Sequence, residues 1–260
     1  MLFYKMNGLG NDYIFIDAEK ANKNDLRFFY NNLKDVVINL SNRNFGIGGD
    51  GVVIVDNSIV ADAKMRIFNA DGTEGNTCGN ALRCIGKILF DKNVGRRKDF
   101  TVETLCGIKQ VFVQSAVDNS AILTINMGKA KIVHSNDDID FIDVGNPHAV
   151  VYVPTLDNKA ILKAKRISNK YDVNAEVVNV LNDNQIQMRV WERGSNETMA
   201  CGSGACAVAY SANKRGRVKD EVEVLLKGGK LLIKLTNDEL YMTGEVQLNY
   251  IGEVNIYNYG

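Results

Sequence analysis

The sequence is poor in several features that mark other classes of protein. Its 260 residues include only two prolines and two histidines, which argues against long irregular linkers and leaves few imidazole ligands for zinc. Lysine plus arginine equals aspartate plus glutamate, at 31 each. Since the chain carries no net charge, no overall electrostatic field would recruit nucleic acid or an anionic membrane.

Long apolar runs are also missing. No segment approaches the roughly 20 apolar residues that a membrane-spanning helix needs, and residues 1–12 lack the apolar stretch of a secretion signal. Five cysteines cannot all pair within one chain. We therefore expect a cytoplasmic protein with reduced thiols and with no membrane or nucleic-acid partner.

What the sequence does contain is many short strand patterns and few helices. Runs of β-branched and aromatic residues, bounded by Gly, Asn or Asp, occur along the whole chain. Clear helical patterns cover only three stretches, Leu26–Leu40, Cys78–Phe90 and Cys201–Lys214. Many strands with few helices indicate the α+β class.

The two helices that begin with cysteine belong to an internal duplication. When Cys78 is aligned with Cys201 without gaps, Met65–Phe68 lies over Met188–Trp191. Each copy consists of a strand pattern, a polar loop, and a Cys-Gly pair that opens a helix of small residues. This duplication predicts two pseudo-symmetric domains, and ligands often bind where domains meet.

The domain boundary is expected where polar residues break the strand pattern, near Ser115–Ser120. The N-terminal domain is then predicted over residues 1–116 and the C-terminal domain over 117–249. A last strand over 250–260 could return to the first domain.

Cys78 and Cys201 are the strongest candidates for chemistry. Each stands at the start of a predicted helix, where free N–H groups and the helix dipole lower the pKa of a thiol. Two such thiols could act on one carbon from opposite sides, one as a thiolate that removes a proton and the other as a thiol that returns one. This arrangement would invert a stereocentre without a cofactor.

Other interpretations of the cysteines stay open. A free cysteine is often a small buried hydrophobic residue, and this is the role we predict for Cys84, Cys106 and Cys206. The two helix-start thiols could instead form a disulfide, which would inactivate such an enzyme. A metal site is disfavoured because the chain has no Cys-x-x-Cys pair.

Polar residues at turns and strand ends could complete a site. His148 follows an Asn-Pro turn and could orient a thiol or a substrate. Glu192 and Arg193 end a strand, where they could offer a carboxylate near Cys201 and a guanidinium for a substrate carboxylate, or form a surface ion pair of little energetic value. The position that duplicates Glu192 is Asn69, which is also polar.

Residues 46–51, Gly-Ile-Gly-Gly-Asp-Gly, are dense in glycine and could cradle an anion. They are not a P-loop, because no Gly-Lys-Ser/Thr follows, and no helix or paired acidic residue completes a dinucleotide fingerprint. Asn11 and Asn174 carry amide groups, which both donate and accept hydrogen bonds and so suit a zwitterionic ligand.

Taken in order, these motifs resemble those of the diaminopimelate epimerases over essentially the whole chain. The blocks that carry the resemblance are Met6–Asp12, Gly46–Gly51, Phe68–Glu74, Cys78–Asn80, Gly145–His148, Glu192–Gly194, Glu197–Gly204 and Tyr241–Gly244. The chain departs from the family pattern at Ala81, where a glycine is usual, and at Ser195-Asn196, where a small residue and glycine are usual. These departures put substrate affinity or loop closure in question more than the chemistry.

The resemblance implies two similar domains, each a β-barrel-like sheet around a central helix. It implies conversion of LL- to meso-2,6-diaminopimelate, in lysine and peptidoglycan precursor synthesis, by a homodimer that needs no cofactor. By matching positions, Cys78 and Cys201 would be base and acid. The other positions implied to bind substrate or assist the thiols are Asn11, Asn69, Gly79, Asn80, Asn146, His148, Asn174, Glu192, Arg193, Gly202 and Ser203.

Three kinds of protein remain as alternatives. One shares the fold but acts on another amino acid, such as a histidine or proline-type substrate; Asn69, Asn174 and Arg193 instead favour a substrate with a second polar end. The second is a non-catalytic amino-acid-binding protein, which would not need two matched thiols. The third is a metal-binding structural protein.

Overall fold

The chain folds into two compact units. The computed structural model describes residues 1–260. The first unit comprises residues 1–125 and 245–260, and the second comprises residues 126–244. Both boundaries fall inside strands, β8 (Ser120–Lys129) and β17 (Glu239–Glu253), so each of these strands contributes to both units.

The first unit is a curved sheet that closes on itself. Strands β17, β1, β2, β3, β4, β6, β7 and β8 pair in that succession, and β8 pairs with β17 to complete the ring. The strands that belong wholly to this unit are β1 Leu2–Gly8, β2 Asn11–Asp17, β3 Gly51–Asp56, β4 Ala63–Asn69, β5 Glu74–Gly75, β6 Asp99–Thr104 and β7 Gly107–Val117.

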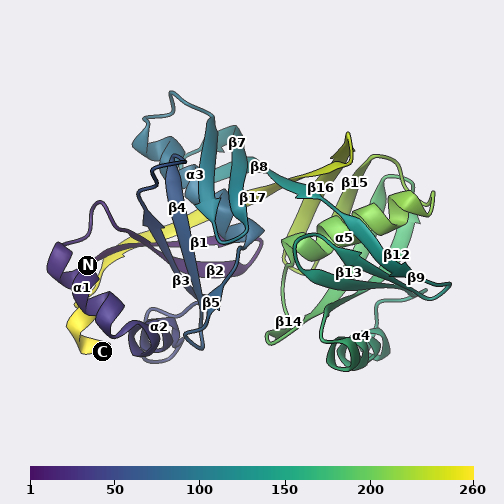
Figure 1. Ribbon diagram of the computed structural model, residues 1–260, viewed down its shortest axis with the longest axis horizontal. Helices are drawn as coiled ribbons and strands as arrows, with labels where there is room; N and C mark the ends of the chain where they lie inside the picture. The colour runs from purple at the N-terminus through teal and green to yellow at the C-terminus, as the bar shows by residue number, and fades with distance from the viewer. The chain divides into compact units, whose positions relative to one another are not determined.

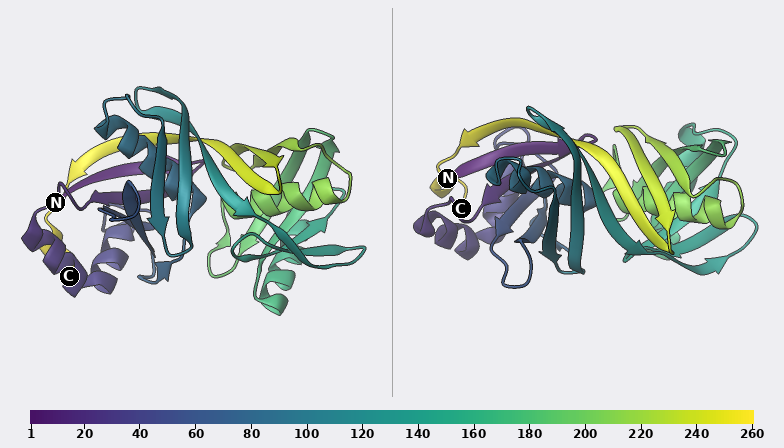
Figure 2. Two further views of the ribbon diagram at one scale, coloured as in Figure 1. Left: turned by 45° about the horizontal axis from the view of Figure 1, so that its top comes forward. Right: turned by 90° about the horizontal axis from the view of Figure 1, so that it is seen from above.

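Both chain termini lie in the first unit, where β1 and β17 run side by side (Figure 2). The backbone N–H of Val254 donates to the carbonyl of Met1 at 3.0 Å. Beyond β17, the short 3₁₀ helix η1 (Ile256–Asn258) buries Ile256 in a hydrophobic cluster with Phe3 and Phe29. The last residues of the chain therefore belong to the core of the first unit.

The second unit repeats the strand pairing of the first. In both, a parallel pair (β2–β3 or β11–β12) is followed by an antiparallel pair (β3–β4 or β12–β13) and then a second parallel pair (β4–β6 or β13–β15). Its own strands are β9 Lys131–Ser135, β10 Ile139–Asp143, β11 Pro147–Tyr152, β12 Asn174–Asn182, β13 Gln185–Glu192, β14 Asn196–Glu197, β15 Glu221–Leu226 and β16 Gly229–Thr236.

Each unit encloses one helix that is buried on nearly every side. In the first unit this is α3 (Gly79–Lys92), and in the second it is α5 (Gly202–Lys214), which packs against strands from β10 to β16 (Figure 1). The small apolar residues of α5 need such an enclosure, and α3 buries Arg83 and Lys87 as well as its apolar residues. Gly86 of α3 shows how tight it is, because a Cβ there would lie 2.5 Å from Leu123 and Val111. The predicted α+β fold, with two similar sheets each around a helix, is confirmed.

The outer helices differ between the units. The second unit has α4 (Asn158–Tyr171), which covers β11, β12 and β13. The first has α1 (Lys23–Asn31) and α2 (Leu33–Ser41) where the sequence predicted one helix over 26–40. The break falls at Asn32, whose backbone angles, φ −121° and ψ 29°, are not helical. Its backbone N–H still makes the helical bond to the Phe28 carbonyl at 3.1 Å, and its side-chain amide donates to the same carbonyl at 3.0 Å, which caps the end of α1.

The polar residues at 115–120, where the domain boundary was expected, form the turn between β7 and β8 inside the first unit. Asp118 there has φ +46°, a backbone conformation that Asp adopts more readily than most residues. The turn therefore reverses the chain between paired strands, and the unit boundary falls further along, inside β8.

Of the three cysteines predicted to be buried, two are. Cys84 of α3 and Cys206 of α5 are 1% and 0% exposed. The prediction for Cys106 is wrong, because this residue is exposed in the turn between β6 and β7, where no neighbouring element covers it.

Candidate active site

Cys78 is the residue from which α3 begins. It has extended backbone angles, φ −144° and ψ 120°, and its side chain is half-buried. Its Sγ lies 3.5 Å from Oδ1 of Asn11, and Asn80 donates from Nδ2 to the same Oδ1 at 3.0 Å. The structure thus brings together three of the residues that the sequence predicted for the site.

The Asn11 side chain is fixed by Asp50, on the side away from Cys78. Its Nδ2 donates to Asp50 Oδ2 at 2.6 Å, and Asp50 in turn accepts from Arg43 at 3.0 Å. Since both oxygens of Asp50 act only as acceptors, the Asn11 amide group must present Oδ1 toward Cys78 and Asn80. Asp50 and Arg43 thus support the candidate site, and the sequence alone did not single them out, although Asp50 lies within the glycine-dense segment.

The glycines of residues 46–51 are explained by close packing. A Cβ at Gly46 would lie 2.1 Å from the carbonyl oxygen of Asn39, and one at Gly49 would lie 2.8 Å from Nζ of Lys5. Lys5 is buried here and bonds to the Gly48 carbonyl and to Asp12. Lys5, which reaches this loop from β1, therefore already has an anionic and a carbonyl partner.

Asn69 lies apart from the Cys78 contacts. It ends β4, is exposed, and donates from Nδ2 to Thr73 Oγ1 at 3.0 Å. Its backbone N–H also bonds to Thr73, at 2.8 Å. Asn69 thus anchors the tight turn that leads toward Cys78 in the chain.

Cys201 occupies the corresponding place at the start of α5. Its side chain is only 5% exposed, its Sγ accepts from the backbone N–H of Gly204 at 3.4 Å, and Ser203 Oγ lies 3.6 Å away. Burial, followed by the charges of Glu192 and Glu176, raises the pKa of the Cys201 thiol well above its ordinary value of 9.0. The expectation that the helix start lowers this pKa is therefore wrong for Cys201, because burial and two carboxylates outweigh one N–H donor.

His148 lies beside Cys201's helix at the first residues of β11. Its ring is fully buried, with Nδ1 2.7 Å from Oε1 of Glu176 and Nε2 3.2 Å from Oδ1 of Asn146. Asn146 also lies 3.5 Å from Ser203 Oγ. A polar chain therefore runs from β12 through His148 to the first turn of α5.

Glu192 ends β13 and points inward. Thr198 donates to its Oε1, and burial raises the pKa of the Glu192 carboxyl. Its neighbour Arg193 points elsewhere, with the guanidinium 3.0 Å from the Asp172 carboxylate and half exposed. The two residues do not pair with each other, so the surface ion-pair interpretation is wrong for Glu192.

Asn174 begins β12 and is 9% exposed. Its Oδ1 accepts from the backbone N–H of Arg193 at 2.9 Å. This bond fixes the turn after β13 that carries Glu192 and Arg193. The turn uses only the Oδ1 atom of Asn174.

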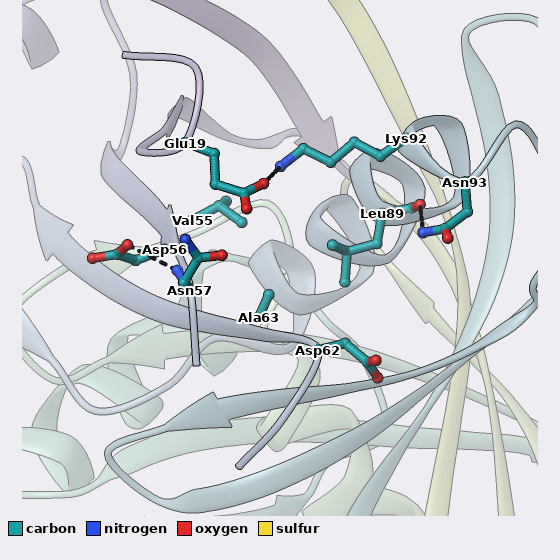
Figure 3. Close-up of a pocket in the computed structure, with 9 residues that line it drawn as sticks. All are labelled: Glu19, Val55, Asp56, Asn57, Asp62, Ala63, Leu89, Lys92 and Asn93. Carbon is teal, nitrogen blue, oxygen red and sulfur yellow. Dashed lines mark hydrogen bonds and ion pairs between the residues drawn. The ribbon is translucent and has the colours of Figure 1, made fainter. Parts of the chain in front are cut away.

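A separate polar pocket lies in the first unit (Figure 3). Leu89, Lys92 and Asn93, at the C-terminal end of α3, line it, whereas Cys78 stands at the other end of that helix. Lys92 pairs there with Glu19 at 3.0 Å and with Asp17 at 2.8 Å. The pocket is distinct from the surroundings of both helix-start cysteines.

No cluster of three or more His, Cys, Asp or Glu side chains in the structure is arranged to hold a metal ion. None of the helices is both long and apolar enough to cross a membrane.

Comparison with solved structures defines the class of protein. A predicted epimerase from Pseudomonas aeruginosa superposes with a TM-score of 0.73 at 14% identity, over 97% of this chain and 98% of the other. A hydroxyproline epimerase from Agrobacterium vitis gives 0.71 at 16%, over 98% and 90%. At these identities the likeness shows the fold alone, which is that of a class of two-unit proteins including epimerases and racemases.

Sequence comparison identifies the family within that class. The profile described as diaminopimelate epimerase matches residues 3–133 and 141–249. The diaminopimelate epimerase of Methanococcus maripaludis is 37% identical over 98% of this chain and 100% of its own length, and that of Acetivibrio thermocellus is 36% identical over 98% and 99%. The chain belongs to the diaminopimelate epimerase family.

Proposed function

We propose that the protein is a cofactor-independent isomerase that converts LL-2,6-diaminopimelate to the meso isomer, as a step of lysine and peptidoglycan precursor synthesis. The observation that carries this proposal is the repeated placement of a thiol at the start of a buried helix. Cys78 and Cys201 occupy equivalent positions in the two units, each beside an asparagine or serine at the first turn. Family membership supports the same substrate.

In the proposed reaction each thiol serves one face of the α-carbon. The Cys78 thiolate takes the α-proton and becomes a thiol, and the Cys201 thiol gives its proton to the opposite face and becomes a thiolate. The raised pKa of Cys201 suits the acid, because it keeps the proton on sulfur at neutral pH. One proton is taken and one is given, so the stereocentre inverts with no net transfer.

The negative charge that develops during proton removal needs stabilisation. We propose that the free backbone N–H groups at Gly79-Asn80 and Gly202-Ser203, at the two helix starts, bind the α-carboxylate. Donors fixed in advance at the point where charge develops lower the barrier more than mobile water does.

The remaining polar residues are proposed to orient the reacting groups. His148 and the half-buried Glu192 would assist near Cys201, where both lie close to α5. Further positions proposed to hold the ammonium and distal groups of the substrate are Asn11, Asn69, Asn146, Asn174 and Arg193. A substrate with a second zwitterionic end would need such a polar set.

A homodimer in the cytoplasm, with no nucleic-acid or membrane partner, remains our expectation. It rests on the family resemblance and on the balanced composition. Sedimentation of the purified protein would test the oligomeric state.

The experiment that tests the function is proton NMR of the reduced protein with LL-diaminopimelate in deuterated water. Exchange of the α-proton and appearance of the meso isomer are expected, with both lost in Cys78→Ala and in Cys201→Ala. Cys106→Ala is the matched control, because that thiol is exposed in a turn. Absence of exchange with folded, reduced protein would overturn the substrate assignment and direct the search to proline-type amino acids.

A further inference from the structure

The two units can be compared residue by residue because their strand registers agree. Val53 of β3 pairs with Ile67, and Glu176 of β12 pairs with Val190. Val53 and Glu176 are separated in the sequence by the same number of residues as Cys78 and Cys201, and so are Ile67 and Val190. The second unit therefore carries a glutamate where the first carries a valine.

The neighbouring strands extend the comparison. In the first unit Tyr13 of β2 pairs with Gly51, and in the second His148 of β11 pairs with Asn174. His148 in the second unit is therefore structurally equivalent to Tyr13 in the first. The pair His148 and Glu176 corresponds to Tyr13 and Val53. The two halves are alike in backbone and differ in charge beneath the catalytic helix.

The burial of Glu176 at this position destabilises the folded protein. Glu176 is 0% exposed, and its Oε2 has no hydrogen-bond partner, although Oε1 accepts from His148 at 2.7 Å. Leaving a buried charged oxygen without a hydrogen-bond partner destabilises the folded state. A valine, which the same strand position holds in the first unit, would avoid that cost, so stability does not explain the carboxylate.

The start of α5 is shaped around this carboxylate. A Cβ at Gly204 would lie 2.6 Å from Glu176 Oε1, whereas the equivalent position in α3 is Ala81. The backbone N–H of Gly204 also donates to Cys201 Sγ. The missing side chain at Gly204 therefore lets the Glu176 carboxylate approach the turn that holds the Cys201 thiol.

The geometry points to Glu176 as a positioning residue of the second unit, which fixes His148 with Nδ1–H directed at the carboxylate and keeps the Cys201 thiol protonated. Since a carboxylate only accepts hydrogen bonds, the hydrogen must lie on Nδ1. The neutral ring then accepts at Nε2, 3.2 Å from the Asn146 side chain, with the Asn146 amide group turned so that its N–H donates. The first unit has a valine at this position, Val53, so no equivalent carboxylate lies beneath α3. The assignment of base and acid follows from this asymmetry, and it rests on the proposed function.

The other ionisable groups around α5 are consistent with this role. Glu192 on β13 and His148 on β11 face the Cys201 end, while Asp140 on β10 is paired with Arg215 at the far end of the helix. The β15 and β16 faces are apolar, with Val222, Val224 and Ile233 buried. After burial, the charges of Glu192 and then Glu176 raise the pKa of Cys201.

The first test needs no substitution. The chain has only two histidines, and His134 is exposed on β9, so ¹⁵N NMR of the labelled imidazoles can be assigned without ambiguity. We expect His148 to carry its hydrogen on Nδ1 at pH 7, protected from exchange with solvent, while the ring hydrogens of the exposed His134 exchange freely. A His148 ring without hydrogen on Nδ1 would overturn the positioning role.

The second test isolates the charge. Glu176→Gln keeps an acceptor oxygen for His148 and removes the negative charge, and alkylation by iodoacetamide is followed at each cysteine by mass spectrometry between pH 6 and 10. The midpoint for Cys201 is expected to fall by about one pH unit, which is about a tenfold faster reaction below the midpoint, with Cys78 unchanged. Glu223→Gln, which removes the charge of a carboxylate that bonds to Lys230 and Gln185 away from α5, is the matched control.

An unchanged Cys201 midpoint in folded Glu176→Gln protein would overturn the charge role. Glu176→Asp provides the second variant, because it keeps the charge and withdraws it from His148; it is expected to leave the Cys201 midpoint in place and to lose the Nδ1–H signal. In kinetics, Glu176→Gln is expected to lower kcat by about 10- to 100-fold with KM changed less than about twofold. The NMR and alkylation results stand without any substrate, so failure of the proposed function and failure of this inference are distinguishable.

Discussion

The two helix-start cysteines show how neighbours decide the behaviour of one residue type. Cys78 is half-buried beside the neutral amide groups of Asn11 and Asn80, whereas Cys201 is buried among carboxylates. A thiolate is disfavoured by burial and by nearby negative charge. Identical side chains at equivalent backbone positions are therefore suited to opposite roles.

The pH dependence of the rate follows from this difference. Because the pKa of Cys201 is raised above 9.0, its proton is retained as the pH rises from 7 to 9, and loss of the acid begins only above that range. We expect kcat for the LL to meso direction to stay level up to about pH 9 and then to fall. A fall centred near pH 8 that matches the alkylation midpoint of Cys201 would contradict the assignment of Cys201 as acid.

The space at Gly204 can be tested by adding one methyl group. Gly204→Ala would place a Cβ against Glu176 Oε1, and we expect it to displace the carboxylate, lower kcat by about tenfold or more and destabilise the fold by about 1–3 kcal/mol. The converse change in the first unit, Ala81→Gly, is the control, with a loss of about 1 kcal/mol. Equal effects on kcat from both changes would show that Gly204 has no special relation to Glu176. Kinetics and urea unfolding measure the two quantities.

At the scale of single elements, α5 is fixed at both ends by different chemistry. Its start carries Cys201, and near its end Ser211 donates to Asp140 while Arg215, just after the helix, pairs with the same carboxylate at 2.6 Å. Asp140 is 1% exposed. This network holds the helix against β10 and so determines where its first turn lies.

The Asp140 network predicts a loss of stability in acid. Burial alone would raise the pKa of Asp140, but the hydrogen bonds from Arg215, Ser135 and Ser211 together lower it. A carboxyl with a lowered folded-state pKa stabilises the protein above its unfolded pKa of about 3.9, and that stability is lost as the pH falls through the folded-state value. Wild-type stability should therefore fall more steeply below about pH 4 than that of Asp140→Asn.

Asp140→Asn itself should cost about 2 kcal/mol or more at pH 7, because Arg215 loses its charged partner. Lys214→Ala removes a looser, exposed pair with Asp238 at 3.9 Å and should cost less than about 0.5 kcal/mol. Urea unfolding of wild type and the two variants at pH 7 and at about pH 3 measures both effects. A pH-independent difference between wild type and Asp140→Asn would mean that the Asp140 carboxyl titrates normally.

At the scale of the whole molecule, the chain leaves the first unit within β8 and returns to it within β17. The returning half of β17 pairs with β1 from Leu2 to Asn7. The first unit therefore depends on residues at both ends of the chain, while the second is continuous over residues 126–244.

A truncated chain tests this dependence. Ending the chain after Gly244 removes the partner of β1, and we expect the first unit to unfold at a lower urea concentration than the second. The single tryptophan, Trp191, lies in β13 of the second unit, so its fluorescence reports that unit while circular dichroism reports both. Coincident transitions in the truncated chain would show that the units do not unfold separately.

Much of this organisation could be predicted from local patterns. The gapless alignment of Cys78 with Cys201 is matched by the strand registers, since Ile67 and Val190 have equivalent partners in β3 and β12. Patterns of strand and helix extend over neighbouring residues, and a duplicated pattern therefore predicts a duplicated fold. The break at Asn32 and the exposure of Cys106 were not predicted, because both depend on what surrounds one residue.

The sequence by itself determined the α+β class, the duplication and the two candidate thiols, because these depend on residue types at fixed spacings along the chain. Only the tertiary structure placed Glu176 beneath Cys201 and His148, more than 20 residues from either in sequence. It also decided that Cys201 holds its proton, because the pKa of a thiol depends on burial and on charges that neighbouring strands bring to it.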